Sequence, residues 1–394
     1  MSSILVLIAT LLLGSAPGSS NAVHATCTLS NTPQHDRGVA LVIGNVSYPG
    51  SELKTTRADA CEFGQTLNNL GYIVDLRFDL GETDLNGAVQ QLAHSATGKN
   101  LPIVFYFAGH GFQINGSNYL LPVDFNAGRP AEIAPHSLTF DTILNSLKAV
   151  TNGPKIIILD ACRADPLAQN KPTDWEDGFA PPTNLPPNTL LAYATVAGGI
   201  AADGVGSHSP YTRALIRFSN QPGVSIEDMF KNVRESVSVN TDGQQTPSEF
   251  TSLFKPFYFR DPIYVSTQIS DGDDDVIVKV NDQEIAEWTL DGGKPKSTTL
   301  QTGINHAEVR VYNQRSYTGG IPPFGHQPEG WRYSVDFRDS TNHSLVHLQD
   351  GEDRPADNGP RHGKLFPVAK FDLLVDEQTG SITVVNRNFD FWKH

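Results

Sequence analysis

Four short, continuously apolar runs most strongly constrain how this chain can fold. They occupy residues 39–44, 102–109, 155–161 and 189–195. A strand that is apolar at every position is buried on both faces, as in a parallel sheet covered by helices. Helical periodicity separates or follows these runs over 57–71, 85–96, 209–220 and 225–237, with a further strand at 72–78. We therefore expect an α/β domain in which a mostly parallel sheet is sandwiched by helices.

The pattern changes after about residue 260. Apolar and polar residues alternate over 275–290, 306–313, 331–337, 371–375 and 381–386, and glycine, proline, asparagine and aspartate separate these runs. Alternation with a period of two is typical of antiparallel strands that bury one face. The chain is therefore expected to contain an α/β domain over 37–260 and a smaller all-β, sandwich-like domain over 265–394.

The first 25 residues have the pattern of a signal peptide. Ile4 to Leu13 form an apolar core of about ten residues, which is too short to span a bilayer. Val23 and Ala25 supply the small residues of a cleavage site before Thr26. We expect a secreted or periplasmic protein with no membrane span after signal removal. The usual basic residue near the start is absent, so an uncleaved anchor or a misassigned start are the alternatives.

Charge and cysteine content exclude several classes of protein. The net charge is −14 and no basic run is present, which excludes nucleic acid as the main partner. Three cysteines do not make a disulfide framework. In an exported chain Cys27 and Cys61 could pair, although Cys61 could equally be buried alone in a helix. Either way Cys162 is a candidate for chemistry.

Two of the apolar runs end in residues that can perform acyl transfer. His110 lies between two glycines in "YFAGHGFQ", and Cys162 lies in "ILDACRADP". Ligands of parallel sheets bind at the carboxyl ends of the strands, so neighbouring strands would bring both side chains to one cleft. Histidine can accept the thiol proton while cysteine attacks a carbonyl. The backbone N–H groups of Gly111 and Cys162 would then form an oxyanion hole. The alternative is that both side chains are structural.

The motifs "RGVALVIGN", "YFAGHGFQ", "ILDACRADP", "LLAYATVAG" and "SPYTRALI" occur in an order that resembles the caspase-like cysteine peptidases (peptidase family C14), in their paracaspase and metacaspase branch. The resemblance implies a catalytic dyad of His110 and Cys162. It also implies an acidic first specificity pocket, whose matching residues are Asp59, Asp160 and Asp203. Three carboxylates would bind a guanidinium by charge-assisted hydrogen bonds, so cleavage is expected after arginine, and less well after lysine.

Each of the three acids also has a structural interpretation. Asp59 could cap its helix or occupy the exposed face, and Asp203 lies in the turn-like sequence "ADGVG". Asp160 follows four apolar residues, where an unpaired charge would be costly, and this favours a functional role.

Two departures from the caspase pattern concern activation and metals. The loop over 165–188 contains six prolines and a single basic residue, Lys171, which Pro172 follows. Self-cleavage there is not expected, so the uncut chain should be the active form. The acidic "DGDDD" at 271–275 lacks the spacing of an EF-hand loop. We expect no cofactor and no metal site, and calcium dependence stays open.

The remaining histidines lack the spacing of zinc ligands and are expected at the surface. They are His326, His343, His347 and His362. The function best supported by the sequence is an exported cysteine endopeptidase acting on peptides or proteins with a basic residue before the scissile bond. A catalytically silent caspase-like interaction module is the main alternative, and a ligand-binding α/β protein with coincidental motifs is a third. No residue pattern identifies a partner for the β domain.

Overall fold

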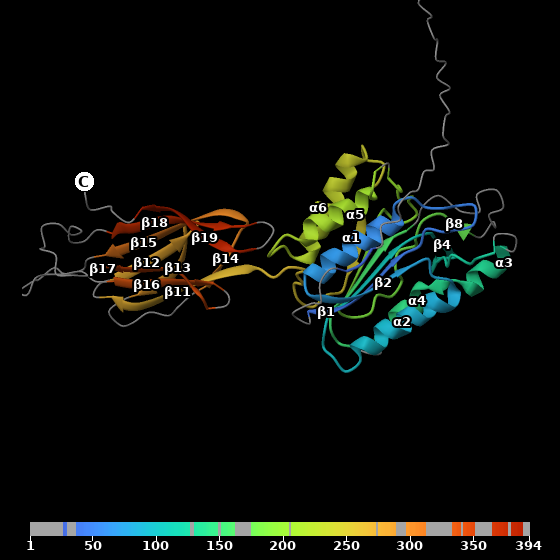
Figure 1. The fold of residues 1–394 in the computed structure, drawn as a ribbon, viewed down its shortest axis with the longest axis horizontal. Helices are drawn as coiled ribbons and strands as arrows, with labels where there is room; N and C mark the ends of the chain where they lie inside the picture. Colours follow the sequence, from blue (N-terminus) through green and yellow to red (C-terminus); the bar gives the residue numbers. More distant parts are fainter. Residues whose placement is uncertain are drawn as a thin grey trace, which may run out of the picture.

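The computed structural model describes most of both expected domains. It covers residues 27–29, 37–126, 130–148, 151–161, 175–204, 206–272, 275–288, 297–312, 333–339, 342–350, 365–376 and 380–388. Figure 1 shows a body of helices around a sheet, followed by a body built of strands alone. The expected signal peptide over 1–25 lies outside the described residues.

The central sheet of the first body has six strands. They are β1 Gly38–Gly44, β2 Tyr72–Phe78, β3 Ile103–Ala108, β7 Lys155–Asp160, β9 Thr189–Tyr193 and β10 Ser248–Thr251. Their order is β10-β9-β7-β3-β1-β2, and every neighbouring pair is parallel except β9 with β10. The expected mostly parallel sheet is confirmed.

Helices cover both faces of this sheet, which explains why its strands are continuously apolar. In β3, Phe105 and Phe107 face one core while Val104 and Tyr106 face the other. The helices α1 Thr56–Asn69, α5 Pro210–Ser219 and α6 Ile226–Asn240 cover one face, and α2 Glu82–Ala96 and α4 Phe140–Lys148 cover the other (Figure 1). Successive side chains of a strand point to opposite faces, so each position in β3 is buried.

A second, small sheet lies next to the carboxyl end of β3 and was not predicted. It comprises β4 Gly111–Ile114, β5 Ser117–Leu120, β6 Leu138–Thr139 and β8 Trp175–Glu176, and the short helices Pro130–Ile133 (α3) and Ala134–His136 adjoin it. Phe112 of β4 stacks on Trp175 of β8 with ring centroids 3.9 Å apart. Strands of two to four residues are too short for periodicity to identify.

The C-terminal body consists of two antiparallel sheets that share one hydrophobic core. Its strands are β11 Ile263–Gly272, β12 Asp275–Val280, β13 Gln283–Trp288, β14 Ser297–Leu300, β15 Gly303–Tyr312, β16 Tyr333–Asp339, β17 Ser344–Asp350, β18 Leu365–Val375 and β19 Ile382–Asn388. The expected all-β architecture is confirmed. The run 275–290 is a hairpin rather than one strand, because Asn281 and Asp282 take φ values of 50° and 62°, as a two-residue turn requires.

The segment before β1 is attached covalently to the first helix. A disulfide joins Cys27 to Cys61 in α1, with their Cα atoms 5.9 Å apart. Cys61 is therefore paired with Cys27 and is not a solitary buried thiol. None of the described helices has the length and apolar character needed to cross a membrane.

Candidate active site

Strands β3 and β7 lie side by side, as a dyad between their carboxyl ends would require. Ala108 at the end of β3 pairs with Asp160 at the end of β7. His110 follows Ala108 by two residues, and Cys162 follows Asp160 by two. The expected adjacency of the two strands is confirmed. Cys162 itself lies outside the described residues, so its role remains a prediction.

The imidazole of His110 is buried and held through one of its nitrogens. Its Nε2 lies 3.0 Å from the backbone oxygen of Ser51 and 3.1 Å from the Ser51 hydroxyl. A carbonyl oxygen only accepts hydrogen bonds, so Nε2 carries the proton that is donated to it. In the neutral ring the lone pair is then on Nδ1, which makes Nδ1 the atom able to accept a proton.

The side chain of Tyr48 fixes the backbone beside the imidazole. The N–H of His110 donates to the Tyr48 hydroxyl at 3.1 Å, and this hydroxyl donates to the Leu121 carbonyl at 3.0 Å. The Tyr48 and His110 rings meet edge to face with centroids 4.6 Å apart. Gly109 makes room for this arrangement, because a Cβ there would lie 2.5 Å from the Tyr48 hydroxyl oxygen.

Gly111 is close to a second aromatic ring. A Cβ at Gly111 would lie 2.5 Å from Phe179 Cζ, so the glycine is needed for packing as well as for access. Aromatic rings thus fill the space beside both glycines that flank His110. Gly111 begins β4 and pairs with Leu120. Its role as an oxyanion donor stays a prediction.

Asp160 is completely buried, and hydroxyl groups from the start of α5 hydrogen-bond to it. Its Oδ2 accepts from Ser209 Oγ at 2.5 Å and from Thr212 Oγ1 at 2.8 Å. The Thr212 hydroxyl also contacts Tyr106 Oη at 2.6 Å. Hydrogen bonds to a carboxylate offset part of the cost of burying it.

Asp59 is also completely buried, in the first turn of α1. Its Oδ1 accepts from the Ser209 N–H at 3.0 Å and lies 3.1 Å from His208 Nδ1. The alternative that Asp59 occupies the exposed face of its helix is wrong. Ser209 thus joins two predicted pocket residues, because its amide binds Asp59 while its hydroxyl binds Asp160.

The carboxylate of Asp203 lies against the N-terminus of α1. Its Oδ2 accepts from the Lys54 N–H at 2.8 Å, and its Oδ1 accepts from the Thr55 hydroxyl at 2.9 Å. A carboxylate at a helix N-terminus is stabilised by the positive end of the helix dipole. Asp203 can therefore lie in a loop, as its sequence suggests, and still hydrogen-bond to the start of α1. Hydrogen bonds thus link Asp59 with Asp160 through Ser209, and Asp203 with the start of α1, where Asp59 lies.

His208 joins the three predicted acids in this network, and its role was not predicted from the sequence. Its Nδ1 contacts Asp59 and its Nε2 contacts Glu62 Oε2 at 2.5 Å, with 14% of the side chain exposed. The hydrogen bond to Asp59 raises the pKa of His208, burial opposes the rise, and the negative charge of Glu62 adds to it. His208 therefore occupies the carboxylate predicted to recognise a substrate cation, and the contact favours the protonated form of its ring.

The described residues contain no group of three or more histidine, cysteine, aspartate or glutamate side chains able to hold a metal ion. The acidic "DGDDD" is described only in part, because residues 273–274 lie outside the described ranges. His343 and His347 are exposed, as expected, and His326 and His362 lie outside the described residues. Calcium dependence remains a question for experiment.

Comparison with known proteins agrees with this architecture. The profile of the caspase domain family matches residues 37–258, more than half of the chain. The human mucosa-associated lymphoid tissue lymphoma translocation protein 1 is 29% identical over 166 residues, which are 41% of this chain and 19% of that protein. Its mouse homolog is 30% identical over the same length. The similarity thus spans about a fifth of the length of these relatives.

Proposed function

The chain belongs to the caspase domain family, in its paracaspase branch, and on this basis we propose that it is an exported cysteine endopeptidase cleaving after arginine. The observation that carries the proposal is the register of β3 and β7, in which Ala108 pairs with Asp160. Adjacent strands lie about 4.8 Å apart, so we expect side chains two positions beyond this pair to be able to meet. These positions are His110 and Cys162.

The reaction follows from the hydrogen bonding of His110. Cys162 Sγ attacks the carbonyl carbon before the scissile bond while His110 Nδ1 accepts the thiol proton. Breaking the C–N bond releases the amine, which takes that proton and leaves a thioester on Cys162. Water then attacks the thioester, its proton passes to His110, and the thiol is restored. The N–H groups of Gly111 and Cys162 stabilise the oxyanion, by about 3 kcal/mol per donor.

The cluster of Asp59, Asp160 and Asp203 supports specificity for arginine. A guanidinium binds carboxylates through two parallel hydrogen bonds, whereas the ammonium of lysine cannot, so lysine substrates should react more slowly. Asp59 and Asp160 have no exposed surface in the described conformation. We propose that substrate entry displaces the His208 ring from Asp59, so that the arginine side chain takes its place.

Export is supported by an observation from the structure as well as by the N-terminal sequence. The disulfide between Cys27 and Cys61 is of a kind that persists in oxidising compartments and is rare in the cytosol. Cys27 directly follows the proposed first mature residue, Thr26. We therefore propose that the protein acts in a secreted or periplasmic location.

Hydrolysis of fluorogenic peptides ending in arginine, lysine or aspartate tests the proposal. The chain starting at Thr26 is assayed with a thiol reductant, with and without calcium, beside Cys162→Ala and His110→Gln. Arginine cleavage that both substitutions abolish is the expected result. Cleavage after aspartate would retain the dyad and overturn the acidic pocket. No cleavage by a folded chain would favour a catalytically silent interaction module.

A further inference from the structure

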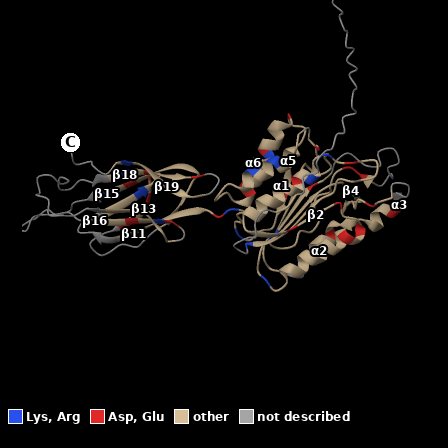
Figure 2. Ribbon diagram, in the orientation of Figure 1, with Lys and Arg blue, Asp and Glu red and all other residues tan. Residues whose placement is uncertain are grey.

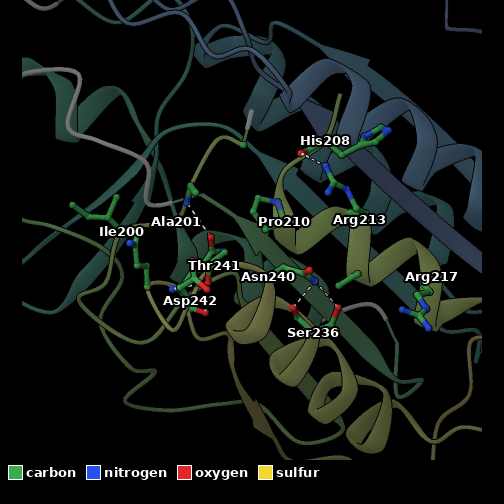
Figure 3. A pocket seen from close by; sticks show the side chains of 15 residues that line it. Ile200, Ala201, His208, Pro210, Arg213, Arg217, Ser236, Asn240, Thr241 and Asp242 are labelled. Carbon is green, nitrogen blue, oxygen red and sulfur yellow. Dashed lines mark hydrogen bonds between the residues drawn. The ribbon is translucent and has the colours of Figure 1, made fainter. Parts of the chain in front are cut away.

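A cavity of about 640 Å³ lies on the helical face of the first body, outside the proposed dyad. Its walls come from α5, α6, the segment over 241–245, the loop over 200–204 and His208 (Figure 3). A volume of this size is typical of sites for small ligands. Neither His110 nor the three predicted pocket acids line it. The proposed peptidase reaction therefore leaves the cavity unexplained.

Two arginines and His208 are the basic side chains that line the cavity, and the His208 ring also contacts Asp59. Arg213 and Arg217 are exposed and project from successive turns of α5 beside the cavity (Figure 3). Figure 2 shows the basic residues of this helix in blue. Like charges one turn apart on a helix repel each other, by about 0.2–0.5 kcal/mol. Asp242 is the one carboxylate among the lining residues, so the two guanidiniums outnumber it.

The described part of the chain does not neutralise these guanidiniums. There, the single side-chain hydrogen bond of Arg213 goes to the His208 carbonyl at 3.5 Å, and the Arg217 guanidinium lies 5.1 Å from the centroid of the Phe218 ring. No ion pair with a described carboxylate is formed by either residue.

We propose that this cavity binds a small multivalent oxyanion, with carboxylate or phosphate groups, between Arg213 and Arg217. Each guanidinium can donate two parallel hydrogen bonds to such a group, and the bound charge removes the repulsion between the arginines. The opposite wall adds Ser236, whose hydroxyl lies 3.3 Å from Asn240 Nδ2 and keeps its own proton to donate.

The cavity shares a wall with the proposed specificity pocket. Ala202 lines the cavity and directly precedes Asp203. The Ala202 N–H donates to Gln245 Oε1 at 3.1 Å, and Gln245 Nε2 donates to the Ala194 carbonyl at 2.7 Å. Gln245 also lines the cavity, so a bound anion stabilises the loop that carries Asp203. This coupling to substrate binding rests on the proposed function, whereas anion binding itself does not.

Calorimetric titration of the full chain with sodium citrate, and separately with inorganic phosphate, tests the site at constant ionic strength. We expect saturable binding that weakens at least tenfold when Arg213→Gln and Arg217→Gln are combined. Lys231→Gln is the matched control, because this exposed lysine of α6 pairs with Asp228 and lies outside the cavity. Circular dichroism establishes that each variant is folded.

The outcomes separate the two parts of the inference. Binding of citrate alone identifies a carboxylate site, and binding of phosphate alone identifies a phosphate site. Absence of binding, or equal binding by the double variant, overturns the proposal. If the ligand binds, it should also lower the KM for arginine peptides severalfold in the wild type and not in the double variant. A chain that binds the anion but cleaves no peptide would contradict only the proposed function.

Discussion

Close packing beside His110 determines whether its imidazole is positioned to act as a base. We predict that Gly109→Ala lowers kcat/KM for arginine peptides at least tenfold, because the new Cβ would lie 2.5 Å from the Tyr48 hydroxyl oxygen. Relieving this overlap should lower the free energy of unfolding by about 2 kcal/mol, measured by urea denaturation. Gly87→Ala in α2 is the control, since open space surrounds it and it should stabilise the helix by about 1 kcal/mol. Full activity of Gly109→Ala would contradict the role given to Tyr48.

His208 predicts a pH-dependent contribution to stability. Its pKa is raised in the folded state by the hydrogen bond to Asp59 and by Glu62, against an unfolded value of about 6.5. The stabilisation is therefore complete below about pH 6.5 and is lost as the pH rises through the raised folded value. We expect the free energy of unfolding of the wild type to exceed that of His208→Gln by about 1–2 kcal/mol just below pH 6.5, and the difference to shrink at alkaline pH.

Urea unfolding of both proteins across this pH range measures the difference. His136→Gln serves as the comparison, because the contact of His136 with Glu82 is exposed and should contribute little. A difference between wild type and His208→Gln that stays constant with pH would show that the His208 ring binds Asp59 in its neutral form.

Most of these contacts join residues far apart in the chain, which limits what the sequence can predict. His110, Asp59 and Asp160 were identified because each belongs to a local motif with a recognisable order. Ser51 and Ser209 were not identified, since nothing near them in the sequence indicates that they meet His110 and Asp59 across 59 and 150 positions. The acids could be named, but not the groups that hold them.

The hydrogen bond from Thr212 to Asp160 joins the start of α5 to the end of β7. We predict that Thr212→Val lowers the free energy of unfolding by about 2–3 kcal/mol, because Asp160 loses a hydroxyl donor in a fully buried setting. Arginine peptides should show a raised KM, since Asp160 would no longer be held in position. Thr212→Ser retains the hydroxyl and should behave like wild type. Equal effects of serine and valine would assign the loss to packing alone.

The strands β1, β2, β3, β7 and β9 were predicted from the sequence, whereas helix α4 and the strands β10, β11 and β17 were not, although β11 has ten residues. Strands such as β3 and β7 carry apolar side chains toward two cores, so burial alone gives them a readable pattern. The strands β4, β5, β6 and β8 have two to four residues, and their pairing depends on tertiary contacts such as the stack of Phe112 on Trp175. The small sheet next to His110 therefore could not be derived from periodicity.

The two bodies of the molecule have separate hydrophobic cores. The core of the C-terminal body draws on residues from Val265 to Val375, whereas the two cores around the central sheet end at Phe259. The family match likewise ends at residue 258, before β11 begins at Ile263. This separation explains why the change from helical to alternating periodicity near residue 260 was visible in the sequence.

The disulfide between Cys27 and Cys61 fixes the start of the proposed mature chain to the first body. It closes a loop over a separation of 34 residues, for which chain entropy predicts a stabilisation of about 3–4 kcal/mol. We expect the combined Cys27→Ser and Cys61→Ser variant to unfold at correspondingly lower urea concentration than wild type without reductant, and at the same concentration with dithiothreitol. Equal stability without reductant would contradict the bond. Because the assay of Cys162 requires a reductant, this variant also shows whether lost activity reflects the thiol or the opened loop.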